Sequence, residues 1–293
     1  MSNFKTGKLS LLNKLSLIWN RVAPSWAEGQ ITSQLYLHNT QQTKTFKIPK
    51  GFEQSTIKTP GGDICTYKTG KGPTVVFVHG WGGGAYQFFS LMRGLKECGF
   101  TALAFDHLGH QNSENKPATI QQLISTTNYI LQQVKKNQAN GLQALVGHDI
   151  GCIVITNTKP DLIKSLPLFF ISPIFNYKLY FLRKLSQLNL HPDILKKYAS
   201  QFTANYNKES AKLELAKNLP KYSDVCVIAH DKNDTVSAIS ESIKFCKKFP
   251  ITKLLITKEW GHDRIISSES VWQELKSHLN YDDTTINFSK FSH

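Results

Sequence analysis

The sequence lacks the features that would place it in a membrane or around a metal ion. Its 293 residues contain no apolar run of about 18 residues, the length that a membrane-spanning helix needs. Only five cysteines are present, and no cluster of cysteine and histidine occurs at metal-ligand spacing. We therefore expect no membrane span, no metal and no cofactor. An odd number of scattered cysteines is typical of buried thiols in a reducing compartment, which predicts a cytoplasmic location.

Acidic residues are scarce relative to basic ones. The chain has 21 Asp and Glu against 35 Lys and Arg, and its formal net charge is +14. The lysines are spread along the chain without the interleaved aromatic residues of RNA-binding surfaces. We interpret the charge as a solvated basic surface and expect no nucleic-acid partner. Attraction to anionic substrates or to an anionic membrane stays open.

One amphipathic segment lies near the N-terminus. Residues 8–22 place Leu11, Leu15, Ile18 and Val22 on one face of a predicted helix, with basic side chains elsewhere. This helix either docks on the folded domain or lies on a membrane surface. No small-residue cleavage site follows it, so we expect no signal peptide.

From residue 52 onward, strand and helix patterns alternate with short connections. Buried strands are predicted by short apolar runs such as Thr74–Val78, Leu142–Val146 and Leu166–Ile171. A hairpin around Gly61 precedes them, and helical patterns such as 120–134 separate them. This alternation is typical of an α/β fold with a mostly parallel sheet covered by helices on both faces.

Residues 174–222 interrupt the alternation, because they show helical spacing, many lysines and no strand pattern. We interpret them as a helical cap inserted into a core that consists of residues 52–173 and 223–280. Residues 1–51 then form an N-terminal helix and linker, and residues 281–293 form a tail.

The segment around Asp149 has the pattern of a strand, a very tight turn and a helix. A Gly-x-Asp-x-Gly turn, residues 147–151, lies between two apolar runs. The two glycines let the backbone pass close to its neighbours, while the middle residue is held at the tip in a strained conformation. This is the pattern of a nucleophile elbow with aspartate at its tip.

Further polar segments follow other predicted strands, where ligands bind in parallel sheets. His79-Gly80 follows one strand, residues 106–113 follow the next, and Asp234 and Gly261-His262 follow two late strands. Over residues 52–279 these segments and the elbow resemble the α/β-hydrolase superfamily in order and spacing. The resemblance implies the α/β-hydrolase fold and a triad of Asp149, Asp234 and His262.

Within that superfamily, three segments resemble small bacterial serine esterases and lysophospholipases. They are the loop 79–83, the His-Asp-Lys-x-Asp segment that ends at Asp234, and the late Gly-His-Asp-Arg segment that begins at Gly261. Those enzymes carry serine at the elbow. An elbow aspartate instead resembles haloalkane dehalogenases, fluoroacetate dehalogenases and soluble epoxide hydrolases. Their other motifs fit incompletely, since Trp81-Gly82 stands where epoxide hydrolases usually have proline. The reaction class therefore follows from Asp149, whereas the substrate does not.

Aspartate changes the chemistry expected at the elbow. It is an anion at neutral pH and can attack a saturated carbon directly, which gives an ester of its own carboxylate. His262 would activate a water against that ester, and Asp234 would orient the imidazole. Backbone N–H groups of Trp81 and Ile150 would receive the oxyanion. We expect a small, apolar epoxide or organohalide as the substrate.

Alternatives stay open at this stage. Asp149 could cap the following helix in a binding or signalling protein that has lost its nucleophile. It could also act as the base for direct attack by water in an esterase-like hydrolase. Asp231 competes with Asp234 for the role of the acid.

Several neighbouring side chains are candidates for roles outside the triad. His148 and Asp106 occupy positions that are more often structural, and His110 could line the pocket. Epoxide hydrolases protonate the opening epoxide with two cap tyrosines. Five tyrosines in the predicted cap are candidates: Tyr177, Tyr180, Tyr198, Tyr206 and Tyr222.

Overall fold

The computed structural model describes residues 46–137, 141–187, 191–209, 213–215 and 226–279. The helix predicted at residues 8–22 and the tail predicted at residues 281–293 lie outside the described residues. The membrane-surface contact considered for residues 8–22 therefore stays a prediction.

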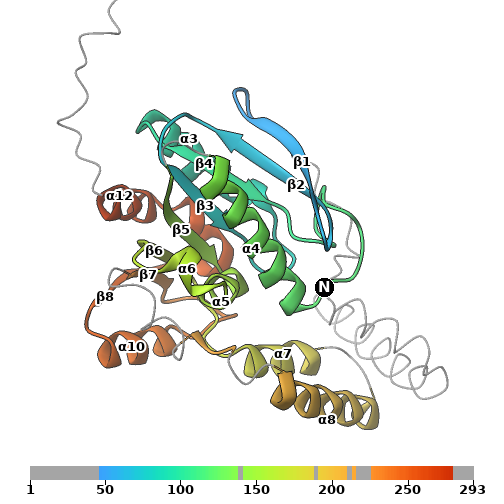
Figure 1. Ribbon diagram of the computed structural model, residues 1–293. Helices are drawn as coiled ribbons and strands as arrows, with labels where there is room; N and C mark the ends of the chain where they lie inside the picture. The colour runs from blue at the N-terminus through green and yellow to red at the C-terminus, as the bar shows by residue number, and fades with distance from the viewer. Residues whose placement is uncertain (1–45, 138–140, 188–190, 210–212, 216–225, 280–293) are drawn as a thin grey trace, which may run out of the picture.

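One eight-stranded sheet forms the centre of the described structure, in the order β1-β2-β4-β3-β5-β6-β7-β8 (Figure 1). β1 pairs with β2 and β2 pairs with β4 in antiparallel fashion, whereas the remaining neighbours are parallel. The strands are β1 (Glu53–Thr59), β2 (Gly62–Thr69), β3 (Thr74–Val78), β4 (Thr101–Phe105), β5 (Leu142–His148), β6 (Leu168–Ile171), β7 (Cys226–Asp231) and β8 (Thr252–Thr257). The predicted hairpin and the predicted mostly parallel sheet are confirmed.

Helices cover both faces of this sheet (Figure 1). The main ones are α3 (Phe89–Glu97), α4 (Ile120–Asn137), α5 (Ile150–Thr156), α10 (Ile239–Lys248) and α12 (Glu269–His278). Short helical segments are η1 (Ala85–Phe88), α6 (Pro160–Ile163), α11 (Gly261–Arg264) and η3 (Ile265–Ser267). α3 and α12 pack on one face, and α4 and α5 pack on the other.

Successive side chains of β3 alternate between the hydrophobic clusters on the two faces of the sheet. Val75 and Phe77 belong to the cluster with α3 and α12, whereas Val76 and Val78 belong to the cluster with α4 and α5. Successive side chains of a strand point to opposite faces, so a strand that is apolar at every position must be covered on both. The unbroken apolar runs of the sequence therefore place these strands inside the sheet.

Two helices occupy the described part of residues 174–222: α7 (Tyr177–Ser186) and α8 (Pro192–Glu209). They follow β6 in the chain and lie together in yellow and gold in Figure 1. The rings of Phe181 and Phe202 stack with centroids 3.6 Å apart, which joins the two helices. The division of the chain into a core and a cap stays a prediction.

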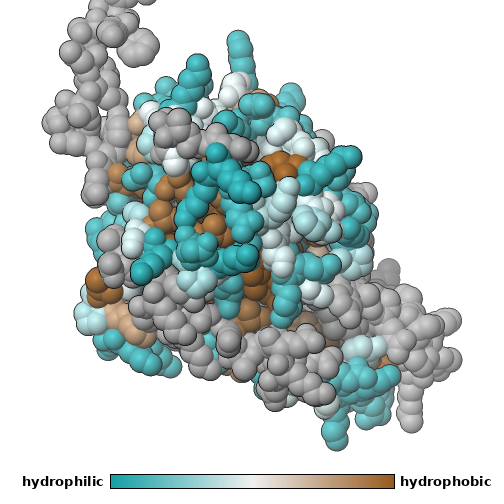
Figure 2. All heavy atoms as spheres, in the orientation of Figure 1, coloured by the Kyte–Doolittle hydropathy of each residue, from teal (hydrophilic) through white to brown (hydrophobic). Residues whose placement is uncertain are grey.

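The described surface is largely hydrophilic in this orientation, with hydrophobic residues in smaller areas between (Figure 2). None of the helices built from described residues is both long enough and apolar enough to cross a bilayer. All five cysteines lie in the described ranges and are free thiols, as their spacing predicts.

The turn between β5 and α5 has the strained geometry predicted for an elbow. Asp149 has φ 54° and ψ −124°, a backbone conformation with positive φ that residues other than glycine rarely adopt. Two residues later, Gly151 lies so close to β3 that an added Cβ would be 2.2 Å from the carbonyl oxygen of Val78. The absence of a side chain at this position lets α5 begin directly against the sheet and fixes the direction of the turn.

We expect Gly151→Ala to lower the free energy of unfolding by about 1–3 kcal/mol, because a backbone oxygen has to move to admit the methyl group. Urea unfolding of the purified variant measures the loss. Gly61→Ala is the matched control, since its Cβ would meet only side-chain atoms at 3.3 Å or more. Equal stability of the two variants would contradict the close approach of α5 to β3.

Candidate active site

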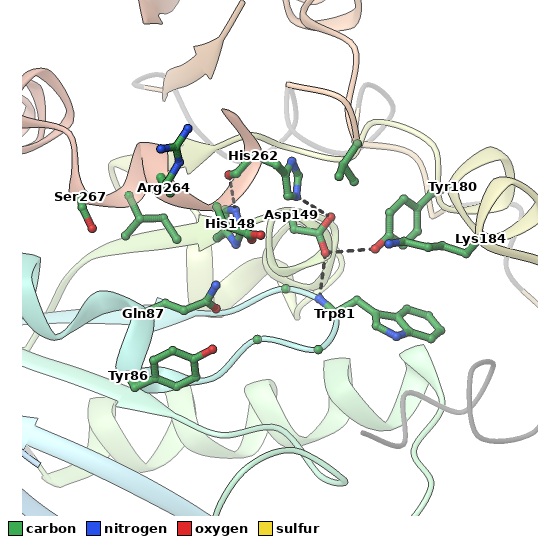
Figure 3. A pocket seen from close by; sticks show the side chains of 16 residues that line it. Trp81, Tyr86, Gln87, His148, Asp149, Tyr180, Lys184, His262, Arg264 and Ser267 are labelled. Atoms are coloured by element: carbon green, nitrogen blue, oxygen red, sulfur yellow. Dashed lines mark hydrogen bonds and ion pairs between the residues drawn. The ribbon is translucent and has the colours of Figure 1, made fainter. Parts of the chain in front are cut away.

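Asp149 is buried, and its carboxylate lies against the loop that follows β3 (Figure 3). A Cβ at Gly80 would be 2.3 Å from Asp149 Cβ, so the loop can approach this closely only with glycine there. The next backbone N–H, that of Trp81, donates a 2.8 Å hydrogen bond to Asp149 Oδ2. The oxyanion-type donor predicted at Trp81 therefore holds one oxygen of the elbow aspartate itself.

The other predicted oxyanion donor, Ile150, is the first residue of α5, and its role stays a prediction. The Asp149 side chain makes no capping hydrogen bond to α5. Asp149 therefore occupies the N-cap position of α5 without the side-chain hydrogen bond that a capping role would use.

His262 lies in α11, just after β8, and joins the two predicted carboxylates. Its Nδ1 is 2.8 Å from Asp234 Oδ2, and its Nε2 is 3.4 Å from Asp149 Oδ1. The Nδ1 nitrogen donates, because a carboxylate at this distance accepts. The structure thus brings Asp149, His262 and Asp234 together in the order expected of a triad.

Asp234, rather than Asp231, is the acid that contacts the imidazole. Asp234 Oδ1 accepts the backbone N–H groups of Val236 and Ser237, which orients its other oxygen toward His262. Asp231 instead accepts hydrogen bonds from the Thr257 hydroxyl and the Trp260 N–H, and so ties the end of β7 to the loop after β8. Asp231 supports the segment that carries His262 without touching the ring.

The three ionisable groups stabilise one another's charged forms. Burial alone would lower the pKa of His262, but the carboxylates of Asp149 and Asp234, one beside each ring nitrogen, raise it to about 10. Burial opposes ionisation of both carboxyls, yet the pKa of Asp149 is lowered by His262, and that of Asp234 by His230 and His262. The resting site therefore holds two carboxylates and one imidazolium at neutral pH.

Two neighbours complete the surroundings of the triad. His148 Nε2 donates to the carbonyl oxygen of His262 at 3.0 Å, and burial lowers the His148 pKa, so this ring is neutral. The Tyr180 hydroxyl, from α7, lies 3.4 Å from Asp149 Oδ2. Burial, followed by the charge of Asp149, raises the pKa of this phenol, which keeps its proton in place.

Asp106 and His110 accept hydrogen bonds from the backbone of the segment that follows β3. Asp106 accepts hydrogen bonds from the backbone N–H of Ala85 and from the Tyr67 hydroxyl, consistent with a structural position. His110 Nε2 accepts from the Gly82 N–H and does not line the cavity beside Asp149. The expectation that His110 could line the pocket is therefore wrong.

A cavity of about 450 Å³ opens beside Asp149. Its walls come from the loop after β3, the end of β5, helix α7 and the segment after β8 (Figure 3). Most of the lining side chains are polar or aromatic: Trp81, Tyr86, Gln87, His148, Asp149, Tyr180, Lys184, His262, Asp263, Arg264 and Ser267. The volume suits a small organic molecule that can reach the carboxylate of Asp149.

Sequence patterns locate the triad but not the contributions from α7. Tyr180 appears only as one of five cap tyrosines, and no sequence signal distinguishes Lys184 from the other lysines. Both reach the site because α7 packs over the carboxyl ends of the strands. The helical spacing of the α7 residues shows which of them share a face, but it does not show the surface against which that face packs.

One group of described side chains lies close enough to share a metal ion: His148, His262 and Asp263 each offer an atom within 4.8 Å of the others. Both nitrogens of His262 already face carboxylates, at Asp234 and Asp149. We assign no metal to this group, because a metal ion there would compete with the pairing that orients the triad.

A family model described as alpha/beta hydrolase fold matches residues 73–168. This segment runs from β3 to β6 and includes the loop at Trp81 and the elbow at Asp149. No match was found among curated protein sequences.

Solved structures that are similar to this chain include esterases, an epoxide hydrolase and a phospholipase. An esterase from Pyrococcus furiosus is 17% identical, with a TM-score of 0.63, and the match covers 83% of this chain and 97% of the esterase. An epoxide hydrolase from Vigna radiata is 16% identical, with a TM-score of 0.57, over 80% of this chain and 99% of that one. A bacterial membrane phospholipase A is 18% identical, with a TM-score of 0.56, over 96% and 98%. The chain has the α/β-hydrolase fold, as its motifs predict.

The raised pKa of His262 has a measurable consequence for stability. A histidine whose folded pKa lies above its unfolded value of about 6.5 stabilises the fold at low pH, and this contribution is lost as pH rises through the folded value. We therefore expect the free energy of unfolding to fall between about pH 6.5 and about pH 10.

Urea unfolding across this range should show the fall in the wild type and a smaller fall in His262→Gln. Other groups titrate near pH 10, so the difference between the two proteins is the quantity to follow. Histidine NMR of Asp149→Asn should show a lower His262 pKa than in the wild type. An unchanged pKa in that variant would exclude a close interaction between the two side chains.

Proposed function

We propose that this protein is a hydrolase that acts through a covalent ester on Asp149, which a His262-activated water then hydrolyses. One observation supports this proposal above the others: the two oxygens of Asp149 differ. Oδ2 is held by the Trp81 N–H, whereas Oδ1 accepts no hydrogen bond from the described residues and faces His262 Nε2 at 3.4 Å. Oδ1 is thus the oxygen free to form a bond.

In the first step, Oδ1 attacks a saturated electrophilic carbon of an epoxide or a haloalkane. A carbon–oxygen bond to Asp149 forms as the epoxide carbon–oxygen bond or the carbon–halogen bond breaks. An opening epoxide takes a proton from the Tyr180 hydroxyl, and a departing halide is stabilised by the Trp81 indole N–H. Tyr180 suits the first role because its raised pKa keeps it a neutral donor.

Ester formation prepares the second step electrostatically. It removes the negative charge of Asp149, one of the two carboxylates that raise the His262 pKa. The imidazolium then loses its proton, to the Tyr180 phenolate after epoxide opening or to solvent after halide departure. Neutral His262, still oriented by Asp234, becomes the general base for water.

Water attacks the carbonyl carbon of the Asp149 ester and gives its proton to His262. Negative charge develops on Oδ2, beside the Trp81 N–H that already lies 2.8 Å away. The bond between Asp149 Cγ and Oδ1 breaks, and Oδ1 leaves with the substrate carbon as an alcohol that takes the proton from His262. Asp149 is regenerated with one oxygen from water. The net reaction converts an epoxide to a diol, or a haloalkane to an alcohol and acid.

A binding or signalling protein is the second candidate, and a specific contact favours it. The Trp81 N–H is already occupied by Asp149 Oδ2, so a bound ester would find this oxyanion donor taken. Such a protein would hold a ligand in the cavity without turnover.

Isotope labelling separates these two functions. We expect turnover of a panel of epoxides and haloalkanes in ¹⁸O-water to place label in the Asp149 carboxylate, because water attacks the ester there. Mass spectrometry of the peptide that contains Asp149 measures it. His262→Gln should accumulate the alkyl adduct, since the base for its hydrolysis is missing.

The double variant Asp149→Asn with His262→Gln is the control, and it should carry no adduct at this position. An unmodified mass for His262→Gln after exposure to every substrate, with no wild-type turnover, would favour the binding protein. Circular dichroism shows that the variants are folded.

Tyr180→Phe should slow the opening of epoxides by about 10²–10⁴-fold, because the general acid is lost. Haloalkane turnover should change much less, since a halide leaves without a proton. Tyr177→Phe is the matched control on the same helix, because Tyr177 does not line the cavity. Equal slowing of both substrate classes by Tyr180→Phe would assign the hydroxyl a role in positioning Asp149 instead.

A further inference from the structure

Helix α7 brings a second functional group into the cavity besides Tyr180. Lys184 lies four residues after Tyr180, so the two side chains occupy the same helix face. Both line the cavity that contains Asp149 (Figure 3). Lys184 is half-buried, unlike a lysine that is fully solvated at the surface.

The charge of Lys184 is not neutralised by the part of the chain that the structure describes. Its ammonium lies over the Tyr180 ring, 5.4 Å from the centroid, and makes no ion pair or hydrogen bond with a described residue. The adjacent Arg183 is different, because its guanidinium donates to the carbonyl oxygens of Thr235 and Val236. Arg183 joins α7 to the segment after β7, whereas Lys184 keeps its hydrogen-bond donors for another partner.

Tyr180 fixes the position of this ammonium relative to the reacting carboxylate. The Tyr180 hydroxyl points to Asp149 Oδ2 at 3.4 Å, and Lys184 Nζ lies over the ring of the same side chain. A group bound to Lys184 would therefore lie beside Tyr180, in the same cavity as the carboxylate. A substrate that reaches both needs a short spacer between the bound group and the carbon that Asp149 attacks.

The remaining charges of the cavity explain why a cation is needed there. The triad of two carboxylates and one imidazolium is net negative, and Asp263 adds another acidic side chain to the wall. Arg264 also lines the cavity, but its guanidinium donates to the carbonyl oxygens of Glu259 and Trp260, and its single charge leaves the sum of these groups negative. A substrate anion would be repelled by these groups. An unpaired ammonium offsets this repulsion and can form a charge-assisted hydrogen bond to the anion.

We propose that Lys184 binds a carboxylate of the substrate, so that the preferred substrates are short epoxy- or halo-alkanoic acids. This inference rests on the proposed function, which supplies the attack on an epoxide or carbon–halogen bond. It replaces the expectation of a wholly apolar substrate. A carboxylate, with one negative charge, matches the one positive charge of Lys184. The positive net charge of the chain, +14, favours the approach of such an anion over the whole surface.

Paired substrates test the assignment through kinetics. We expect Lys184→Gln to raise KM for terminal-epoxy and terminal-bromo hexanoates about tenfold, the factor that corresponds to ~1.4 kcal/mol. The kcat values, and both constants for the matching hexanamides, should stay within about threefold, because the amides carry no charge for the ammonium to bind. Lys184→Arg should restore most of the affinity for the acids. Lys178→Gln, a half-buried lysine on the same helix outside the cavity, is the control.

Binding of an unreactive probe tests the site without any turnover. Hexanoate should bind the wild type about tenfold more tightly than hexanamide does, and Lys184→Gln should lose this preference; calorimetry measures both. Preferential hexanoate binding that depends on Lys184, without turnover or adduct on any electrophile, would support the anion site and overturn the proposed catalysis. Equal binding of the two probes, or a preference that survives Lys184→Gln, would overturn the role of Lys184.

Discussion

The ion pair between Asp149 and His262, backed by Asp234, is the interaction on which the rest of the site depends. Three ionisable side chains share a mostly buried position, where an isolated charge would be strongly disfavoured. The carboxylates and the imidazolium are stable there because their opposite charges lie close together. This mutual stabilisation lowers the pKa of both carboxyls and raises the pKa of the imidazole. Removing His262 would leave two buried carboxylates without a compensating charge, whereas removing either carboxylate would leave one ion pair with the imidazolium.

The fold supplies this arrangement from separate strands of one sheet. β5 ends at the strained turn that carries Asp149, β3 ends at the loop with Gly80 and Trp81, and β7 and β8 lead to Asp234 and His262. Parallel strands end at a common edge, so residues distant in sequence converge without long loops. The missing side chains at Gly80 and Gly151 then allow the approach that gives Asp149 its contacts.

The sequence predicts the parts of this site that depend on local turn chemistry and strand order. The glycine spacing around Asp149 indicates an elbow, and the polar segments after the late strands indicate Asp234 and His262. The sequence does not predict what α7 contributes, because a helical period gives the face of Tyr180 and Lys184 but not the surface on which that face packs. The choice between Asp234 and Asp231 is likewise decided by tertiary contacts, since both follow the same strand.

An aspartate at the elbow also determines the order in which chemistry can occur. With both carboxylates charged, His262 begins as an imidazolium and has no lone pair with which to take a proton from water. Asp149 is a poor base as well, because its pKa lies below the usual range of a carboxyl. Direct attack of water on a bound ester, with Asp149 as the base, is therefore disfavoured by the same electrostatics. In the proposed mechanism, bond formation consumes the Asp149 charge and so frees the imidazole, which places nucleophilic attack by the carboxylate before activation of water.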